Sequence, residues 1–148
     1  MSERNPIRLF VTHAFAKHAD WLRVFEYLEN ASNFFYVNLS DPEAAPAAGP
    51  DGVHEALRQQ MADAETVLVL SGLYEDYRDL IQFQLDCAGA LDKAIVAVEP
   101  FGGALEMPAA VRARADEVVR WNDRDIVDAI RRQARHEDTQ RWEVIDFP

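Results

Sequence analysis

The sequence predicts an α/β fold in which helices cover both faces of a parallel sheet. Five short apolar segments, near residues 8–12, 34–39, 66–70, 94–98 and 117–121, alternate with segments of helical period. The third and fourth are apolar without interruption, which indicates strands that are buried on both faces. Strands that alternate with helices are typical of parallel sheets built with right-handed crossovers.

The N-terminal half is expected to supply two strands and two helices. The strand at 8–12 follows Pro6, and a helix over residues 18–30 carries its apolar side chains at helical spacing. After the strand at 34–39, residues 40–50 are rich in Pro, Ala and Gly and are interpreted as a mobile loop. Asp51 is expected to cap the next helix. The inward side chains of that helix are predicted to be Val53, Leu57, Met61 and Ala64.

The C-terminal half contains the helix that matters most for function. After the strand at 66–70, six residues recur at helical spacing and define one face: Tyr77, Leu80, Ile81, Gln84, Ala88 and Leu91. After the strand at 94–98, residues 107–113 form a short helix at most, and the strand at 117–121 comes next. Asn122 is expected to cap a last helix with Ile126, Val127, Ile130 and Ala134 inward. The whole pattern predicts a flavodoxin-like three-layer sandwich with five parallel strands.

Length and composition indicate one domain over residues 1–135 of this 148-residue chain. Residues 136–148 are expected to dock on the domain or on a partner, because they end in the apolar-rich sequence WEVIDF at 142–147. A net charge of -11 opposes binding to nucleic acid. With no long apolar segment, we expect no membrane association and a cytoplasmic location. Cys87 is the only cysteine and is interpreted as a small buried residue.

Several common uses of α/β folds are excluded by the residues at the ends of the predicted strands. The chain has no G-x-G-x-x-G and no G-x-x-x-x-G-K-[ST] sequence, which excludes a dinucleotide-binding Rossmann loop and a Walker phosphate loop. A phosphoreceiver would need an acidic pair after its first strand, where this chain has Thr12 and His13.

The candidate binding residues come after the first three strands, because ligand sites in open α/β sheets lie at the carboxyl ends of strands. Most have a structural alternative. Phe15 could stack on a ring or close the sheet, and His13 could bind a phosphate or serve as a turn residue. Asn38 and Ser40 could cap their loop, and one of Tyr74 and Tyr77 could serve only in packing. The full candidate set is His13, Phe15, Lys17, Asn38, Ser40, Ser71, Tyr74 and Tyr77. We expect no metal ligands, since acidic pairs at helix starts are favourable without a metal.

Five segments together resemble the TIR-like domain family of bacterial antiphage systems such as Thoeris. They are LFVTHAF at 9–15, ASNF at 31–34 leading to NLSDP at 38–42, ADAETVLVLSGLY at 62–74, IQFQLDCA at 81–88 and WN at 121–122. The resemblance covers residues 8 to about 135. It implies the strand order 2-1-3-4-5 and an enzyme that cleaves the nicotinamide–ribose bond of NAD, with NAD as substrate and no cofactor.

The resemblance places the family's catalytic glutamate at Gln84 and its tryptophan at Leu80. An amide would keep the shape of the glutamate and lose the charge that stabilises an oxocarbenium-like centre. Gln84 therefore admits several interpretations: a pseudoenzyme that still binds nucleotide, an engineered isosteric substitution, a family branch that works without the carboxylate, or a structural amide that ties its helix to a loop.

These observations lead to two functional hypotheses. The first is an antiphage-defence protein that processes NAD to an ADP-ribose-derived signal, impaired by Gln84; the alternative is a non-catalytic nucleotide-binding or protein-interaction module. The partners are then NAD or an ADP-ribose-like nucleotide, with self-association or an effector protein also expected. Nucleotide binding, with or without cleavage, predicts that Gln84 faces a cleft bordered by the first loop, residues 38–40 and Tyr74. A Gln84 that is sealed in the core and bonded only to backbone would contradict it.

Overall fold

The computed structural model describes residues 3–16, 18–43, 49–103 and 105–136. It contains one five-stranded sheet in the order β2-β1-β3-β4-β5, with every neighbouring pair parallel. This confirms both the flavodoxin-like three-layer sandwich and the predicted strand order. The strands are β1 (Ile7–Val11), β2 (Tyr36–Asn38), β3 (Thr66–Leu70), β4 (Ala94–Val98) and β5 (Glu117–Val119).

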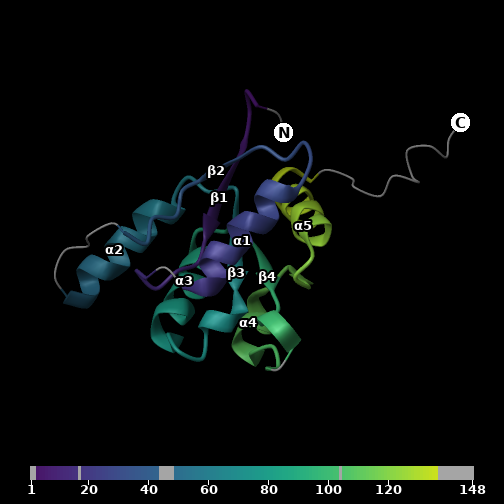
Figure 1. Cartoon of the computed structure of the whole chain (residues 1–148). Coiled ribbons are helices and arrows are strands. Elements are labelled where there is room, and N and C mark those ends of the chain that lie inside the picture. Colours follow the sequence, from purple (N-terminus) through teal and green to yellow (C-terminus); the bar gives the residue numbers. More distant parts are fainter. Residues whose placement is uncertain (1–2, 17, 44–48, 104, 137–148) are drawn as a thin grey trace, which may run out of the picture.

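Helices form the two outer layers (Figure 1). They are α1 (Ala19–Asn30), α2 (Gly49–Met61), α3 (Arg78–Ala90), α4 (Ala109–Arg114) and α5 (Asp123–Arg135), with short 3₁₀ turns η1 (Ser71–Leu73) and η2 (Phe101–Gly103). With right-handed crossovers, the strand order places α1 on one face and α2, α3 and α4 on the other. Helix α5 packs beside α1 and completes the first face.

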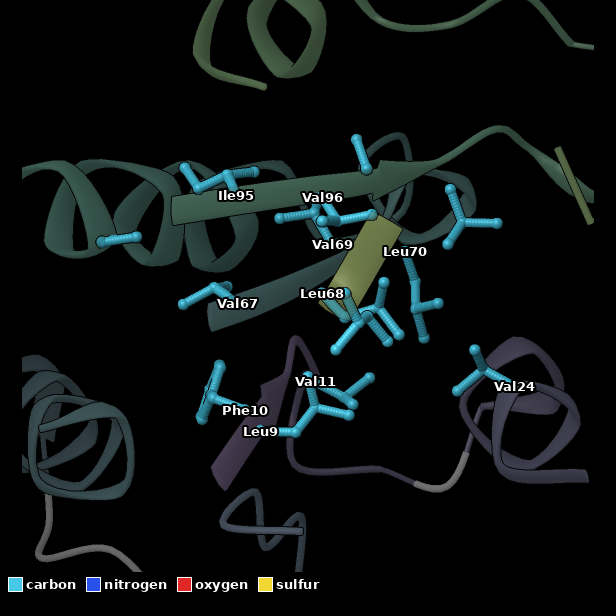
Figure 2. Close-up of a cluster of buried hydrophobic side chains, with 14 of the residues drawn as sticks. Leu9, Phe10, Val11, Val24, Val67, Leu68, Val69, Leu70, Ile95 and Val96 are labelled. Atoms are coloured by element: carbon cyan, nitrogen blue, oxygen red, sulfur yellow. The ribbon is translucent and has the colours of Figure 1, made fainter. Parts of the chain in front are cut away.

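The core lies on both faces of β1, β3 and β4. All five residues of β3 are buried, and β4 is buried from Ile95 onward. Figure 2 shows side chains of these strands pointing alternately to the two helical layers, with Val24 of α1 closing one side. The uninterrupted apolar sequence of β3 therefore reflects burial on both faces, as the sequence predicts.

Several predicted boundaries differ from the observed ones. Helix α2 already begins at Gly49, so Asp51 lies in its first turn and is not the cap. Strands β2 and β5 have only three residues each, shorter than predicted, because they form the two edges and pair on one side only. Leu91 follows the last turn of α3 and is 37% exposed, so it does not belong to the buried face.

Side chains cap two helices at their N-termini. Asn122 Oδ1 accepts a hydrogen bond from the backbone N–H of Asp125, as predicted for α5. His18 is the N-cap of α1, and its Nδ1 accepts from the N–H of Asp20. Both bonds satisfy backbone donors that a helix leaves without an internal partner.

Some expectations concern residues outside the described ones. These are the docking of the C-terminal segment, apart from His136, and the mobility of residues 44–48. Within the described residues, no helix combines the length and the hydrophobicity needed to cross a membrane. Cys87 is a buried free thiol, as predicted.

A close approach between α1 and η1 joins the loops that follow β1 and β3. A Cβ added at Gly72 would overlap the carboxylate of Asp20, which is only 10% exposed. That carboxylate cannot move aside easily, because its Oδ1 is paired with Arg23 Nη1 at 2.6 Å. The glycine is therefore required by space, not by an unusual backbone angle.

We predict that Gly72→Ala lowers the free energy of unfolding by about 2 kcal/mol, the typical cost of overpacking a closed site. Gly89→Ala is the matched control. Its added Cβ meets only the end of the flexible Arg114 side chain, and alanine favours the helix, so its effect should stay within about 1 kcal/mol. Urea denaturation of both variants checks this, and equal effects would contradict the constraint at Gly72.

Candidate functional site at the carboxyl edge of the sheet

The candidate site lies where the loops after β1 and β3 separate. The chain leaves β1 towards β2 and leaves β3 towards β4, so the carboxyl ends of these neighbouring strands form a topological switch point. The loop after β1 begins at Thr12 and His13, and η1 begins at Ser71. Helix α3 follows η1 and directs Gln84 back towards the first loop.

Gln84 is fully buried and uses its whole amide group in hydrogen bonds to backbone atoms. Its Nε2 donates to the carbonyl oxygen of His13 at 2.8 Å and to that of Leu80 at 3.0 Å. Its Oε1 accepts from the backbone N–H of His13 at 3.1 Å. The amide orientation is fixed by these partners, because the reverse orientation would place the oxygen against two carbonyl oxygens.

The expectation that Gln84 faces an open cleft is therefore wrong. The side chain has no exposed surface, and its partners among the described residues are backbone groups. A glutamine on an apolar helical face must find partners for its amide, and here the nearest ones are the peptide groups of the first loop. This arrangement corresponds to the structural interpretation of Gln84, in which the amide ties its helix to a loop.

His13 is a second buried polar residue, and its ring is held in one tautomer. The backbone N–H of Phe15 donates to His13 Nδ1 at 3.1 Å, so this nitrogen carries no proton. His13 Nε2 therefore carries the proton and donates to Gln60 Oε1 at 2.9 Å. Gln60 also bonds both backbone groups of Asp41, accepting from its N–H at 2.9 Å and donating to its carbonyl at 3.2 Å.

Burial lowers the pKa of His13 below its ordinary value of 6.5, because the charged ring would lose its hydration. The hydrogen bond to Gln60 and the charge of Asp41 act in the opposite direction and are weaker. A proton added at Nδ1 would also meet the N–H of Phe15. His13 is therefore a neutral structural residue that joins the first loop to α2.

The remaining candidates of the first two loops also act locally. Phe15 has a left-handed backbone (φ 57°) and packs its ring edge-on against His13, with the centroids 4.8 Å apart. Asn38 is exposed and accepts hydrogen bonds from the backbone N–H and the hydroxyl of Ser40, which is buried. Asn38 thus caps its own loop. Lys17 lies outside the residues that the structure describes.

The three candidates after β3 are Ser71, Tyr74 and Tyr77, and each has different surroundings. Ser71 is 2% exposed, and its Oγ has no hydrogen-bond partner in the described part of the chain. Tyr74 donates from its hydroxyl to Gln82 at 3.1 Å, and Arg78 lies over its ring. Tyr77, the residue before α3, packs against the core. Within the predicted set, hydrogen bonds join Gln84 to His13 and His13 to Phe15. Separate bonds join Asn38 to Ser40 and the backbone of Tyr74 to that of Ser71.

Sequence reasoning missed two groups at this edge. Gln60 follows the inward Leu57 by three residues on α2, and this spacing could have marked it as facing the first loop. The second group joins α1, η2 and the end of β5: the Arg23 guanidinium lies 3.7 Å from the Phe101 ring centroid, and Trp121 contacts Phe101 edge-on at 5.4 Å. These residues are far apart in the sequence, which contains no signal for the pairing.

The Gln84 amide bonds the backbone of His13 and Leu80. It carries no charge that could assist the cleavage of a bond. The described residues also contain no group of three His, Cys, Asp or Glu side chains placed to hold a metal ion. No family model matches the chain, and no curated protein is significantly similar to it. The fold class is an α/β sandwich with a five-stranded parallel sheet.

We predict that Gln84→Glu destabilises the protein by about 3 kcal/mol at neutral pH. A carboxylate would remove both donors and place an oxygen near the carbonyls of His13 and Leu80, at a position that is fully buried from solvent. Protonation restores one donor, so the folded state raises the pKa of the new carboxyl group. The loss should therefore grow as pH rises from about 5 to 8.

Gln59→Glu is the matched control for this substitution, because Gln59 also lies on a helix, α2, but is exposed. Its cost should stay below about 0.5 kcal/mol. Urea denaturation at several pH values measures both variants. An equal, small effect of the two substitutions would show that the Gln84 amide does not hold the first loop.

The lowered pKa of His13 predicts a pH dependence of stability. The unfolded chain binds a proton near pH 6.5 while the folded protein does not, so the free energy of unfolding should rise with pH between about 5.5 and 7.5. His13→Asn removes the titrating ring and retains an acceptor for the N–H of Phe15. Its unfolding free energy should be lower than that of the parent at pH 7.5 and should depend less on pH. An unchanged pH slope in His13→Asn would contradict this assignment.

Proposed function

We propose that this chain is a TIR-like module that acts by binding a protein partner and does not cleave NAD. The observation that carries the proposal is the hydrogen bonding of Gln84, whose Nε2 donates to two backbone carbonyls. The family resemblance assigns a catalytic glutamate to this position. A carboxylate could not make the same two bonds, so this amide suits a structural role better than it suits a disabled catalytic one.

An exposed aromatic residue supports a binding function. Phe101 is 45% exposed and stands at the carboxyl edge with Arg23 over its ring and Trp121 against its side. Arg23 is itself held by its ion pair with Asp20. Exposed aromatic and arginine side chains that are already fixed in place contribute strongly to protein interfaces, because little conformational freedom is lost on binding.

The partner in this proposal is a protein, either a second copy of the chain or an effector in an antiphage system of the cytoplasm. The chain's net charge of -11 does not favour nucleic acid. Sedimentation and co-purification distinguish self-association from effector binding.

The second candidate function is the processing of NAD to an ADP-ribose-derived signal. It is favoured by the resemblance and by the position of Gln84, which lies directly against the loop after β1 at the switch point. This function requires that the first loop, which includes the left-handed Phe15, opens to admit nucleotide. NAD is then the substrate, and no cofactor is needed.

The first part of the test measures chemistry. The parent protein and Gln84→Glu are incubated with NAD, with and without phage-infected cell extract, and nicotinamide release is quantified. We expect no release above background from either protein, since the substitution adds a buried charge without creating an open site. Release by either protein would support the second candidate function and contradict the first.

The second part measures binding. Sedimentation velocity over a range of concentrations detects self-association, and co-purification with an effector encoded by an adjacent gene detects a heterologous complex. Phe101→Ser should weaken the complex by about tenfold or more. Val37→Ser is the control, because Val37 is also exposed (42%) but lies on the edge strand β2. Equal effects of the two variants, or the absence of any complex, would overturn the binding proposal.

A further inference from the structure

An apolar groove between α2 and α3 lies on the face opposite α1 and α5. Its volume is about 230 Å³, and it is lined by Arg58, Phe83, Asp86, Cys87, Ala90 and Leu91. Most of this lining is apolar, and Leu91 is 37% exposed. The groove therefore leaves apolar surface in contact with water at the ends of two packed helices.

The groove has a rigid floor and a charged rim. The Phe83 ring is stacked on His54, with the centroids 3.9 Å apart and the planes within 5° of parallel, and Arg58 lies 5.6 Å from the same ring. Arg58 pairs with Glu55 at the surface, and Asp86 pairs with Arg114. Two ion pairs, Arg58 with Glu55 and Arg114 with Asp86, thus border a mainly apolar surface.

Residues 137–148 have the composition that such a groove would bind. They contain four large apolar residues, Trp142, Val144, Ile145 and Phe147, together with four acidic residues and one arginine. The acidic residues would lie favourably beside Arg58 and Arg114, and the apolar ones would cover Phe83 and Leu91.

The segment also starts at the correct edge of the sheet. Arg135, at the end of α5, forms an ion pair with Glu65 just before β3 and donates to the carbonyl of Pro6 just before β1. Helices α2 and α3 also end at this edge, where Lys93 Nζ donates to the carbonyl of Ala62 at 2.7 Å. The Leu91 end of the groove, just before β4, and the end of α5 therefore both lie at the amino edge of the sheet.

The chain is long enough to connect the two places. Packed layers are spaced by about 10 Å, so passing from one helical layer to the other requires roughly 20 Å. Six extended residues, 137–142, span about 20 Å. Trp142 is thus the first large apolar residue that can reach the groove.

We propose that residues 137–148 bind in the α2–α3 groove of their own chain and cover Cys87. Attachment to α5 gives the segment an effective concentration on the order of millimolar at the groove. Binding to a second copy lacks this advantage and is opposed by the repulsion between two chains of charge -11. This inference goes beyond the proposed function and does not depend on it.

The test uses the single cysteine of the full chain as a reporter of the groove. The rate at which Cys87 reacts with a thiol reagent is measured for the parent and for two variants, Ile145→Asp in the segment and Leu91→Asp in the groove. Each variant should react about fivefold faster or more, because each releases the segment that limits access to the thiol. Thr139→Asp and Leu22→Asp are the matched controls and should leave the rate unchanged, since Leu22 is exposed on α1.

Two further measurements make the result decisive. Circular dichroism verifies that every variant is folded, and the reaction rate is measured over a hundredfold range of protein concentration. Rates that rise in both variants and do not depend on concentration support binding within one chain. Equal rates in the parent and Ile145→Asp, or protection that appears only at high concentration, would overturn the proposal.

Discussion

Two hydrogen bonds between the Gln84 amide and the backbone of His13 help to hold the carboxyl edge of the sheet together. They connect α3, which follows β3, to the second residue beyond β1, while a third bond of the same amide, to the carbonyl of Leu80, stays within α3. At a topological switch point, the two loops lead in opposite directions, and nothing in the sheet ladder itself joins them. The buried Gln84 amide supplies one connection, with one acceptor and two donors all satisfied. The contact of Asp20 with Gly72 and the bond from the Leu70 N–H to Thr12 Oγ1 supply others.

The same edge is held by other polar groups that are neutral or paired. His13 keeps one tautomer between Phe15 and Gln60, and burial lowers its pKa. On the other side of the switch point, the Asp20 carboxylate is paired with Arg23 and packs against Gly72. Internal contacts therefore occupy the part of this edge around Gln84, where proteins of this architecture commonly place a ligand. For this reason the proposed binding surfaces lie at Phe101 and in the α2–α3 groove.

The amino edge has a different construction. There Arg135 bonds Glu65, and this hydrogen bond is the main reason that the pKa of Glu65 is lowered. The contact fixes the end of α5 beside the starts of β1 and β3, and hence the point from which residues 137–148 leave. Arg135 also complements the helix dipole, because a positive charge is favourable in the last turn of a helix.

The sequence by itself determined the fold class, the strand order through the family resemblance, and most helix faces. Uninterrupted apolar strands such as β3 and β4 are stable only where both faces are buried. The Asn122 cap is predicted from the residues next to it in the sequence. The sequence also marked Gln84 as the unusual residue of its helix. The sequence predicted the ends of β2 and β5 less accurately, because these are edge strands and their length depends on pairing with one neighbour only.

Only the tertiary structure decided what Gln84 does. Its spacing shows that it faces inward, but whether an inward amide meets a cleft or a peptide group depends on the path of a loop 71 residues earlier in the chain. The pairing of His13 with Gln60, 47 residues later, and of Arg23 with Phe101 is of the same kind. Local sequence determines which face of a helix a side chain lies on, whereas packing between distant elements determines its partner. At Gln84 that partner is the backbone of the first loop, so the position predicted to be catalytic has a structural role.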